Sequence, residues 1–266
     1  MTRIAVIGTG VWGQNILKTL HTLPGVEIAW TAGRDWRTKL DRAVKSSIPT
    51  DGVAIAVPAP AQALIARTCL DASMAVFLEK PMALTLADAR LIRDRAFVMG
   101  DLPVLVDHVG LFAAGYETFR TELIGRGITR LETLSGNRGP FRNWGPHSAL
   151  WDWGSHEAAF ALDLIGTPDV ITAKEKDGVY SVNLCFRDAS AKLVFGNGFT
   201  ERRRALLAVA DGLQIILDSN APGMPPLTKA LSVWLDAVEG EPRDERVGCG
   251  LGVKVVELLA NVQAML

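Results

Sequence analysis

The fold is decided by the stretch Ile4-Ala5-Val6-Ile7-Gly8-Thr9-Gly10-Val11-Trp12-Gly13. A short apolar run predicts a buried strand, and glycines spaced as GxGxxG then lead into a predicted helix over 11–20. In such a turn Gly8 permits the tight bend, Gly10 lets the backbone approach a pyrophosphate, and Gly13 lets the helix pack on the strand. The free N–H groups of the helix N-terminus would face the anion. We interpret this stretch as a dinucleotide-binding turn; the alternative is an ordinary strand-to-helix turn with chance glycines.

The pattern of this first unit repeats over the first hundred residues. Short apolar runs alternate with helical patterns, and Thr85 with Asp88 three residues later resembles a capping box. Alternation of this kind predicts a parallel sheet with right-handed crossovers, which is an α/β Rossmann domain over 1–106. The expected strands after the first are 26–31, 52–57, 75–78 and 103–106, and the expected later helices are 38–44, 61–72 and 85–97.

The alternation of strand and helix patterns ends after residue 107. Two helical patterns are followed by strand-like segments with little helix between them, and Asp177-Gly178 is a tight-turn signal. We therefore expect an α+β domain over 107–266 with a mostly antiparallel, open-faced sheet, whose last helix is a candidate to pack back on the Rossmann domain. The expected helices are 113–124, 153–165, 227–238 and 251–266, and the expected strands are 170–176, 179–187, 191–199 and 204–217.

The composition of the chain argues against several classes of binding partner. The chain has 28 basic and 29 acidic residues and a net charge of -1, which argues against nucleic acid or an anionic membrane. Cys69, Cys185 and Cys249 lie far apart without a CxxC pair, which argues against a disulfide framework and against a metal site. The N-terminus has no signal-peptide pattern, and no apolar window is long enough to span a bilayer. We expect a cytoplasmic protein.

The end of the second strand bears on the cofactor. An acidic residue at this point would bind the ribose 2′-hydroxyl of NAD. In this sequence the position is occupied by Gly33, with Arg34 beside it. A guanidinium there could pair with a 2′-phosphate, which favours NADP. The alternative is that Asp35 fills the acidic role after a shift of two residues, which would favour NAD.

A second signal is Glu79-Lys80-Pro81 at the end of the fourth strand. Ligands of open α/β sheets bind beyond the carboxyl ends of the strands, so Lys80 is expected near the nicotinamide. Its ammonium could donate to a substrate hydroxyl and stabilise a developing alkoxide. Taken alone, Lys80 would more readily be read as a solvated turn lysine.

The third signal is Asp152-Trp153-Gly154-Ser155-His156 in the second half of the chain. On a helix, Asp152 and His156 lie on one face, about one turn apart. A histidine can accept the hydroxyl proton while hydride leaves the same carbon, and Asp152 could bind substrate or bias the histidine. The alternatives are a helix cap for Asp152 and a core position for His156.

Together, the three motifs resemble the glucose–fructose oxidoreductase/inositol dehydrogenase/MocA (Gfo/Idh/MocA) family over nearly the whole chain, most closely in FLEKPMALTLADA at 77–89. The resemblance implies an NAD(P)-dependent dehydrogenase or reductase acting on a CH–OH or keto group of a sugar, cyclitol or activated sugar, with Lys80, Asp152 and His156 as catalytic residues. Two rival hypotheses are an NAD(P)-binding sensor without activity and a lyase or epimerase without net redox change. The expected cofactor-binding residues are Gly8, Gly10, Val11, Trp12, Gly13, Gly33, Arg34, Val57, Pro58, Glu79 and Lys80.

Substrate contacts are less well marked. His108 follows the fifth strand and could face the substrate, with a hydrogen bond at the domain junction as an equal alternative. Arg138 and Arg142 could bind a carboxylate or phosphate of the substrate, although solvated loop arginines are commoner. Gln62 and Glu157 depart from the residues usual in the family.

The sheet of the second half also predicts assembly. Val170–Leu217 is rich in Val, Leu, Ile and Phe, and helices on one face would leave the other face open. Pairing two such faces would bury them, as the resemblance also suggests. We expect a homodimer or homotetramer that binds a small molecule, with a sugar derivative as its substrate.

Overall fold

The computed structural model describes residues 1–139, 147–244, 246 and 248–266, which form two compact units. The first unit contains Met1–Asp107 and Pro225–Val253, and the second contains His108–Met224 and Lys254–Leu266. The division expected from the sequence, at 106/107, differs by the segment Pro225–Val253. This segment returns from the second half of the chain to pack on the strands of the first unit.

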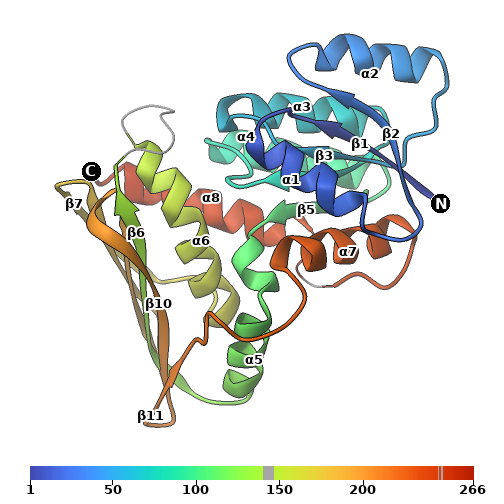
Figure 1. Cartoon of the computed structure of the whole chain (residues 1–266). Coiled ribbons are helices and arrows are strands. Elements are labelled where there is room, and N and C mark those ends of the chain that lie inside the picture. Colours follow the sequence, from blue (N-terminus) through green and yellow to red (C-terminus); the bar gives the residue numbers. More distant parts are fainter. Residues whose placement is uncertain (140–146, 245, 247) are drawn as a thin grey trace. The chain divides into compact units, whose positions relative to one another are not determined.

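The first unit is built on a parallel five-stranded sheet, sheet A, in the order β2-β1-β3-β4-β5 (Figure 1). This order and the connecting helices confirm the Rossmann-type fold predicted from the sequence. Thr85 caps α4 by accepting a hydrogen bond from the Asp88 backbone N–H at 3.1 Å. The strands are β1 (Thr2–Ile7), β2 (Val26–Ala32), β3 (Gly52–Ile55), β4 (Ala75–Glu79) and β5 (Val104–Asp107), and the helices are α1 (Val11–Leu20), α2 (Trp36–Lys45), α3 (Ala59–Asp71) and α4 (Leu86–Val98).

Helix α7 (Pro226–Val238) explains why the first unit includes a late segment of the chain. Its fully buried Trp234 meets Phe77 of β4 edge-on, with the ring centroids 5.7 Å apart. A Cβ on Gly52 would lie 2.8 Å from the Trp234 ring, so β3 needs glycine at this point. A buried tryptophan contributes a large apolar area, and this contact fixes α7 on sheet A.

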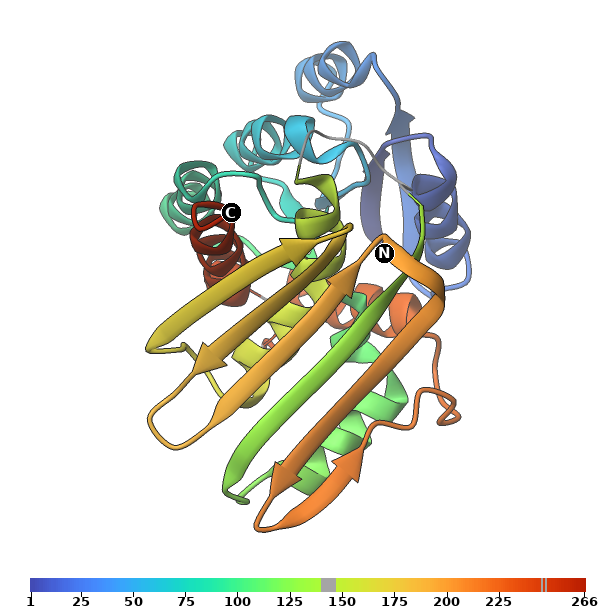
Figure 2. The same ribbon diagram turned by 90° about the vertical axis from the view of Figure 1, so that its left-hand side faces the viewer.

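The second unit contains a six-stranded sheet, sheet B, in the order β11-β10-β6-β9-β8-β7 (Figure 2). All neighbouring strands are antiparallel except β6 and β9, which confirms a mostly antiparallel sheet. The strands are β6 (Ile128–Arg138), β7 (Val170–Lys176), β8 (Val179–Cys185), β9 (Ser190–Gly196), β10 (Gly198–Ala210) and β11 (Leu213–Ile216). The helical segments are the 3-10 turn η1 (Val109–Phe112), α5 (Ala114–Leu123) and α6 (Ser148–Leu164), together with the later part of α8 (Cys249–Gln263).

Strand β6 is absent from the sequence-based expectation, which was wrong on this point. The strand lies in the middle of sheet B, yet its buried face carries Thr133 and Ser135 beside Leu131. Polar residues on the buried face break the apolar alternation by which a half-buried strand is recognised. These two hydroxyls lie near the buried carboxyl group of Glu157 on α6, which accounts for polar residues at these positions.

Helix α6 lies against sheet B in close contact. A Cβ on Gly154 would lie 2.9 Å from Phe195 of β9 and 2.9 Å from Leu259 of α8, so only glycine lets the helix approach this near. At the same end, Trp151 donates its indole N–H to Gln263 at 2.7 Å. The register of α6 against the sheet is therefore fixed by packing. None of the described helices is both long and apolar enough to cross a bilayer.

Candidate active site

The glycine turn after β1 has the geometry of a dinucleotide cradle. Gly8 has φ +124°, and a Cβ there would lie 2.1 Å from the Ala56 carbonyl oxygen. A Cβ on Gly13 would lie 2.0 Å from the Gly8 carbonyl oxygen. Gly10, in contrast, has nothing within 4 Å of its Cβ position. Two glycines thus serve the close packing of the turn, and the middle one leaves open space over the N-terminus of α1, as a bound pyrophosphate requires.

The other residues expected at the cofactor lie around this turn and at the end of β3. Val11 is exposed at the start of α1, and Trp12 is half-buried with an indole N–H that no described residue accepts. Val57 is half-buried and Pro58 is exposed immediately before α3. The structure therefore places all four at the carboxyl ends of β1 and β3, where cofactors of this fold bind.

The end of β2 presents both groups on which cofactor choice depends. A Cβ on Gly33 would lie 3.3 Å from the Thr9 hydroxyl, and Arg34 is exposed. The Asp35 carboxylate accepts the Gly33 backbone N–H at 3.0 Å. The carboxylate therefore accepts a hydrogen bond within the turn itself. The neighbouring Arg34 guanidinium is exposed and has no acid partner among the described residues.

The Lys80 turn is held by buried polar contacts within the first unit. Glu79 ends β4 and is the register partner of Asp107, which ends β5. Gln62 of α3 donates its side-chain amide to the carbonyl oxygens of Glu79, at 3.0 Å, and Pro81, at 2.8 Å. These two bonds bracket Lys80, whose peptide bond to Pro81 is cis. The alternative of a solvated turn lysine is wrong, because Lys80 is buried.

Asp107 is an unusual carboxyl group in this arrangement. Burial raises its pKa to about 7, against the lowering effects of a hydrogen bond with Glu79 and of the Lys80 charge. Desolvation disfavours the charged form of an acid, and here it outweighs the two stabilising contacts. Neither Gln62 nor Asp107 was singled out as a site residue from the sequence. For Asp107 the available signal was its position at the carboxyl end of a parallel strand, and for Gln62 it was the departure from the residue usual in the family.

Helix α6 carries the second predicted pair. It begins at Ser148, so Asp152 and His156 lie inside it, one turn apart, and both are half-buried. The alternative reading of Asp152 as the helix cap is wrong, because the cap position is His147. His156 is only partly exposed, and its role in catalysis stays a prediction.

Glu157, next to His156, is buried against sheet B. Burial raises its pKa, while the nearby hydroxyls of Ser135 and Thr133 and the charge of Arg204 lower it. The two hydroxyls come from the buried face of β6, and Arg204 of β10 is the register partner of Ser135. This polar cluster links α6 to two strands and thereby orients the helix that carries His156.

The substrate candidates are dispersed. His108 is buried at the start of η1, and Arg138 is exposed as the last residue of β6 rather than in a loop. Arg142 lies outside the described residues. The structure thus brings Lys80 together with Glu79 and Asp107 in the first unit, and Asp152 together with His156 in the second. A common site for the two groups remains a prediction.

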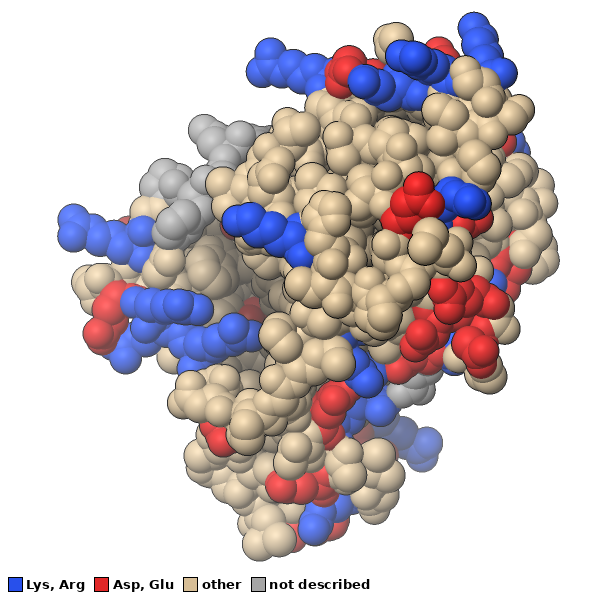
Figure 3. Space-filling model, turned by 45° about the vertical axis from the view of Figure 1, so that its right-hand side comes forward, with Lys and Arg blue, Asp and Glu red and all other residues tan. Residues whose placement is uncertain are grey.

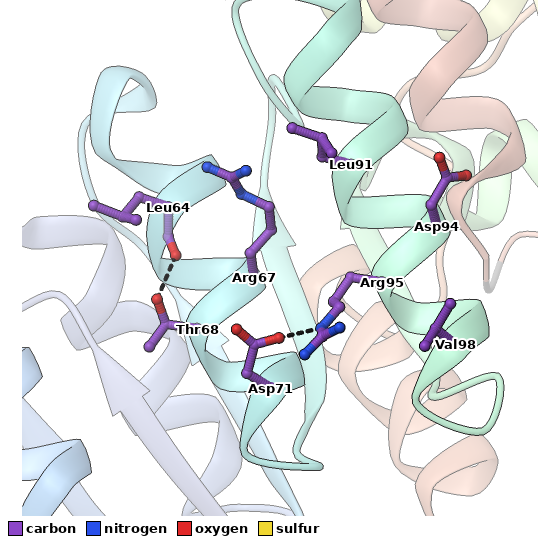
Figure 4. A pocket seen from close by; sticks show the side chains of 8 residues that line it. All are labelled: Leu64, Arg67, Thr68, Asp71, Leu91, Asp94, Arg95 and Val98. Atoms are coloured by element: carbon purple, nitrogen blue, oxygen red, sulfur yellow. Dashed lines mark hydrogen bonds and ion pairs between the residues drawn. The ribbon is translucent and has the colours of Figure 1, made fainter.

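A groove of about 610 Å³ lies elsewhere, between α3 and α4 (Figure 4). None of the predicted site residues lines it. Arg95 and Asp71 form an ion pair across it, and Leu64, Leu91 and Val98 border it. In the view of Figure 3 the surface carries both acidic and basic side chains, with uncharged areas between them. Neither feature points to a second site.

Comparison with known proteins identifies the first unit. Residues 2–108 match the family described as "Oxidoreductase family, NAD-binding Rossmann fold", Gfo/Idh/MocA. These residues form a Gfo/Idh/MocA-family Rossmann domain. The match covers the glycine cradle, the end of β2 and the Lys80 turn, which confirms the resemblance seen in the sequence. The members of this family are described as oxidoreductases whose Rossmann domain binds NAD. Comparison with curated protein sequences gave no match.

Solved structures extend the likeness to the whole chain. A proposed oxidoreductase from Magnetospirillum magnetotacticum is 29% identical, with a TM-score of 0.78, over 97% of this chain and 98% of the other. UDP-N-acetylglucosamine 3-dehydrogenase from Acidithiobacillus ferrooxidans is 16% identical, with a TM-score of 0.81, over 99% and 97%. Aldose-aldose oxidoreductase from Caulobacter crescentus is 16% identical, with a TM-score of 0.80, over 99% and 97%. At these identities the last two show a shared fold.

Proposed function

We propose that this protein transfers hydride between a nicotinamide cofactor and a hydroxyl or keto carbon of a sugar, a cyclitol or an activated sugar. The observation that carries the proposal is the Lys80 turn, buried at the carboxyl end of β4 in a domain that belongs to an NAD-binding oxidoreductase family. Two structurally similar proteins, named above, act on a nucleotide sugar and on aldoses. These likenesses suggest the substrate class.

The residues of this chain would divide the work as follows. Bound nicotinamide would supply the hydride acceptor or donor. His156 would take the hydroxyl proton on an imidazole nitrogen, because an alcohol carbon cannot become a carbonyl while its oxygen keeps the proton. Lys80 would donate a hydrogen bond to the same oxygen and stabilise its negative charge as the proton leaves. Asp152, one turn before His156, would orient the substrate or the imidazole.

The glycine cradle would hold the cofactor pyrophosphate, and the end of β2 would select between NADP and NAD. Gly33 leaves room beside the Thr9 hydroxyl, and the exposed Arg34 guanidinium would pair with a 2′-phosphate. The Asp35 carboxylate is engaged by the Gly33 N–H, which leaves it less available to a ribose hydroxyl. We therefore propose a preference for NADP, with NAD as the second cofactor.

A substrate panel tests the proposal. Purified protein is incubated with NADP or NAD and with hexoses, cyclitols, sugar acids and nucleotide sugars, and reduced nicotinamide is followed by its absorbance. We expect reduction with at least one compound of these classes and its loss in His156→Ala. Turnover that persists unchanged in His156→Ala, or no cofactor binding by the wild type, would refute the proposal.

A further inference from the structure

Two buried carboxyl groups lie at the ends of adjacent strands of sheet A. Glu79 closes β4 and Asp107 closes β5, and the two are register partners in the parallel ladder. Their exposed fractions are 7% and 1%. Register partners on neighbouring strands project to the same face of a sheet, so the two side chains emerge side by side.

The contact between them requires a proton. Asp107 and Glu79 are neighbours in register and their side chains influence each other, yet no N–H or O–H of a described residue donates to either oxygen of Asp107. An ionised carboxylate is only an acceptor, so two carboxyl groups can bond only when one of them is protonated. Two negative charges in a site shielded from water also repel each other, which disfavours the ionisation of both acids.

The remaining negative charge is balanced by a neighbour. The charged groups that act on Asp107 are Glu79 from β4 and Lys80 from the turn that follows. Helix α3 contributes Gln62, an uncharged side chain, which fixes the backbone on both sides of Lys80. Gln62 thus holds the backbone of the turn. The carboxyl pair interacts with the charge of the Lys80 ammonium.

We propose that Glu79 and Asp107 share one proton and, as an acid pair, position the Lys80 ammonium, which makes Asp107 a positioning residue for hydride transfer. The kinetic part of this inference rests on the proposed function, whereas the shared proton does not. When the pair loses its proton, a second negative charge draws the ammonium toward the strands and away from the substrate oxygen. Because the pKa of Asp107 is raised to about 7, this loss falls near neutral pH.

The shared proton is tested by infrared spectroscopy of the intact protein without substrate. We expect a carbonyl band of a protonated carboxylic acid that disappears as the pH is raised through neutrality. Asp107→Asn should remove this band, and Asp94→Asn, at an exposed carboxylate of α4, should leave it unchanged. If the band is absent, or if it persists in Asp107→Asn, the acid pair does not exist.

The positioning role is tested by the pH dependence of kcat on a substrate found in the panel. Wild-type kcat should fall above neutral pH, and Asp107→Asn should remain active without this fall, because asparagine is neutral and can donate to Glu79. Asp107→Leu should lower kcat roughly tenfold to a hundredfold with little change in cofactor affinity, since the ammonium loses its partner. A fall that persists in Asp107→Asn would overturn the role. An infrared band without turnover of any hydroxyl compound would instead refute the proposed function.

Discussion

At the scale of the residue, His156 and Lys80 carry the proposed chemistry. His156→Ala should lower kcat by a factor on the order of 10² or more, the range expected for the loss of a general base. Lys80→Ala should have a similar effect, and the double variant should be little worse than either, because both act on one oxygen. Steady-state kinetics check this, with His21→Ala at the exposed end of α1 as a control. Wild-type turnover in His156→Ala would make His156 a structural residue.

Arg34 carries the second prediction at this scale. Arg34→Ala should weaken NADP(H) binding roughly tenfold or more, the cost of a lost charge-assisted hydrogen bond, and should leave NAD(H) binding nearly unchanged. Titration of nicotinamide fluorescence with both cofactors measures the effect. Arg37→Ala, at an exposed arginine that stacks on Trp36, is the matched control. Equal affinities, or an NAD preference that Asp35→Ala abolishes, would contradict the prediction.

Single residues also show where sequence reasoning ends. The spacing of Gly8, Gly10 and Gly13 predicted the turn because each glycine answers a local backbone demand. Asp107 and Glu157 could not be assigned in this way. Their significance lies in burial against partners far away in the sequence, Glu79 and the hydroxyls of β6.

At the scale of the element, the turn from β1 into α1 separates packing from ligand binding. Gly10→Ala should fold normally, because Gly10 has an ordinary φ of -72° and open space at its Cβ position, but it should weaken cofactor binding at least tenfold. Gly13→Ala should instead destabilise the fold by about 1–3 kcal/mol or more, because its Cβ would collide with the Gly8 carbonyl. Thermal unfolding and cofactor titration measure both variants. Unchanged cofactor binding by Gly10→Ala would contradict the cradle.

Elements were predicted well where their patterns are local. The strands and helices of the Rossmann domain follow from apolar runs, glycine turns and the Thr85 cap. Strand β6 was missed because Thr133 and Ser135 occupy its buried face, and their burial makes sense only once Glu157 of α6 is placed against them. A polar cluster between a helix and a sheet leaves no periodic signal in either segment.

At the scale of the whole molecule, the first unit contains a late segment of the chain, Pro225–Val253, whereas the sequence indicates two consecutive domains. Helix α7 joins the first unit because Trp234 packs on Phe77 and Gly52, residues that precede it by more than a hundred and fifty positions. Nothing in the local pattern of α7 distinguishes the sheet on which it packs. The fold class was therefore predictable, and the membership of this helix was not.

Assembly is the prediction at this scale. On the face of sheet B opposite the buried residues of β10, Leu207 is half-exposed and pairs in register with Glu132 of β6. We propose that two copies pair through this face, so light scattering should give at least twice 28.7 kDa at micromolar concentration. Leu207→Asp should dissociate the assembly through the added charge, and Leu64→Asp on α3 should not. A wild-type monomer would contradict the proposal.

The most direct test of the central claim is isotope transfer from the cofactor. A reduced nicotinamide carrying deuterium at C4 is given to the wild-type enzyme with the keto form of a substrate from the panel, and the product is examined by mass spectrometry and NMR. The account predicts one deuterium on the carbon that becomes the alcohol, and transfer slowed by a factor on the order of 10² or more in His156→Ala under the same conditions. A product formed without deuterium, as a lyase or epimerase would give, or a bound cofactor that is never oxidised, as in a sensor, would contradict it.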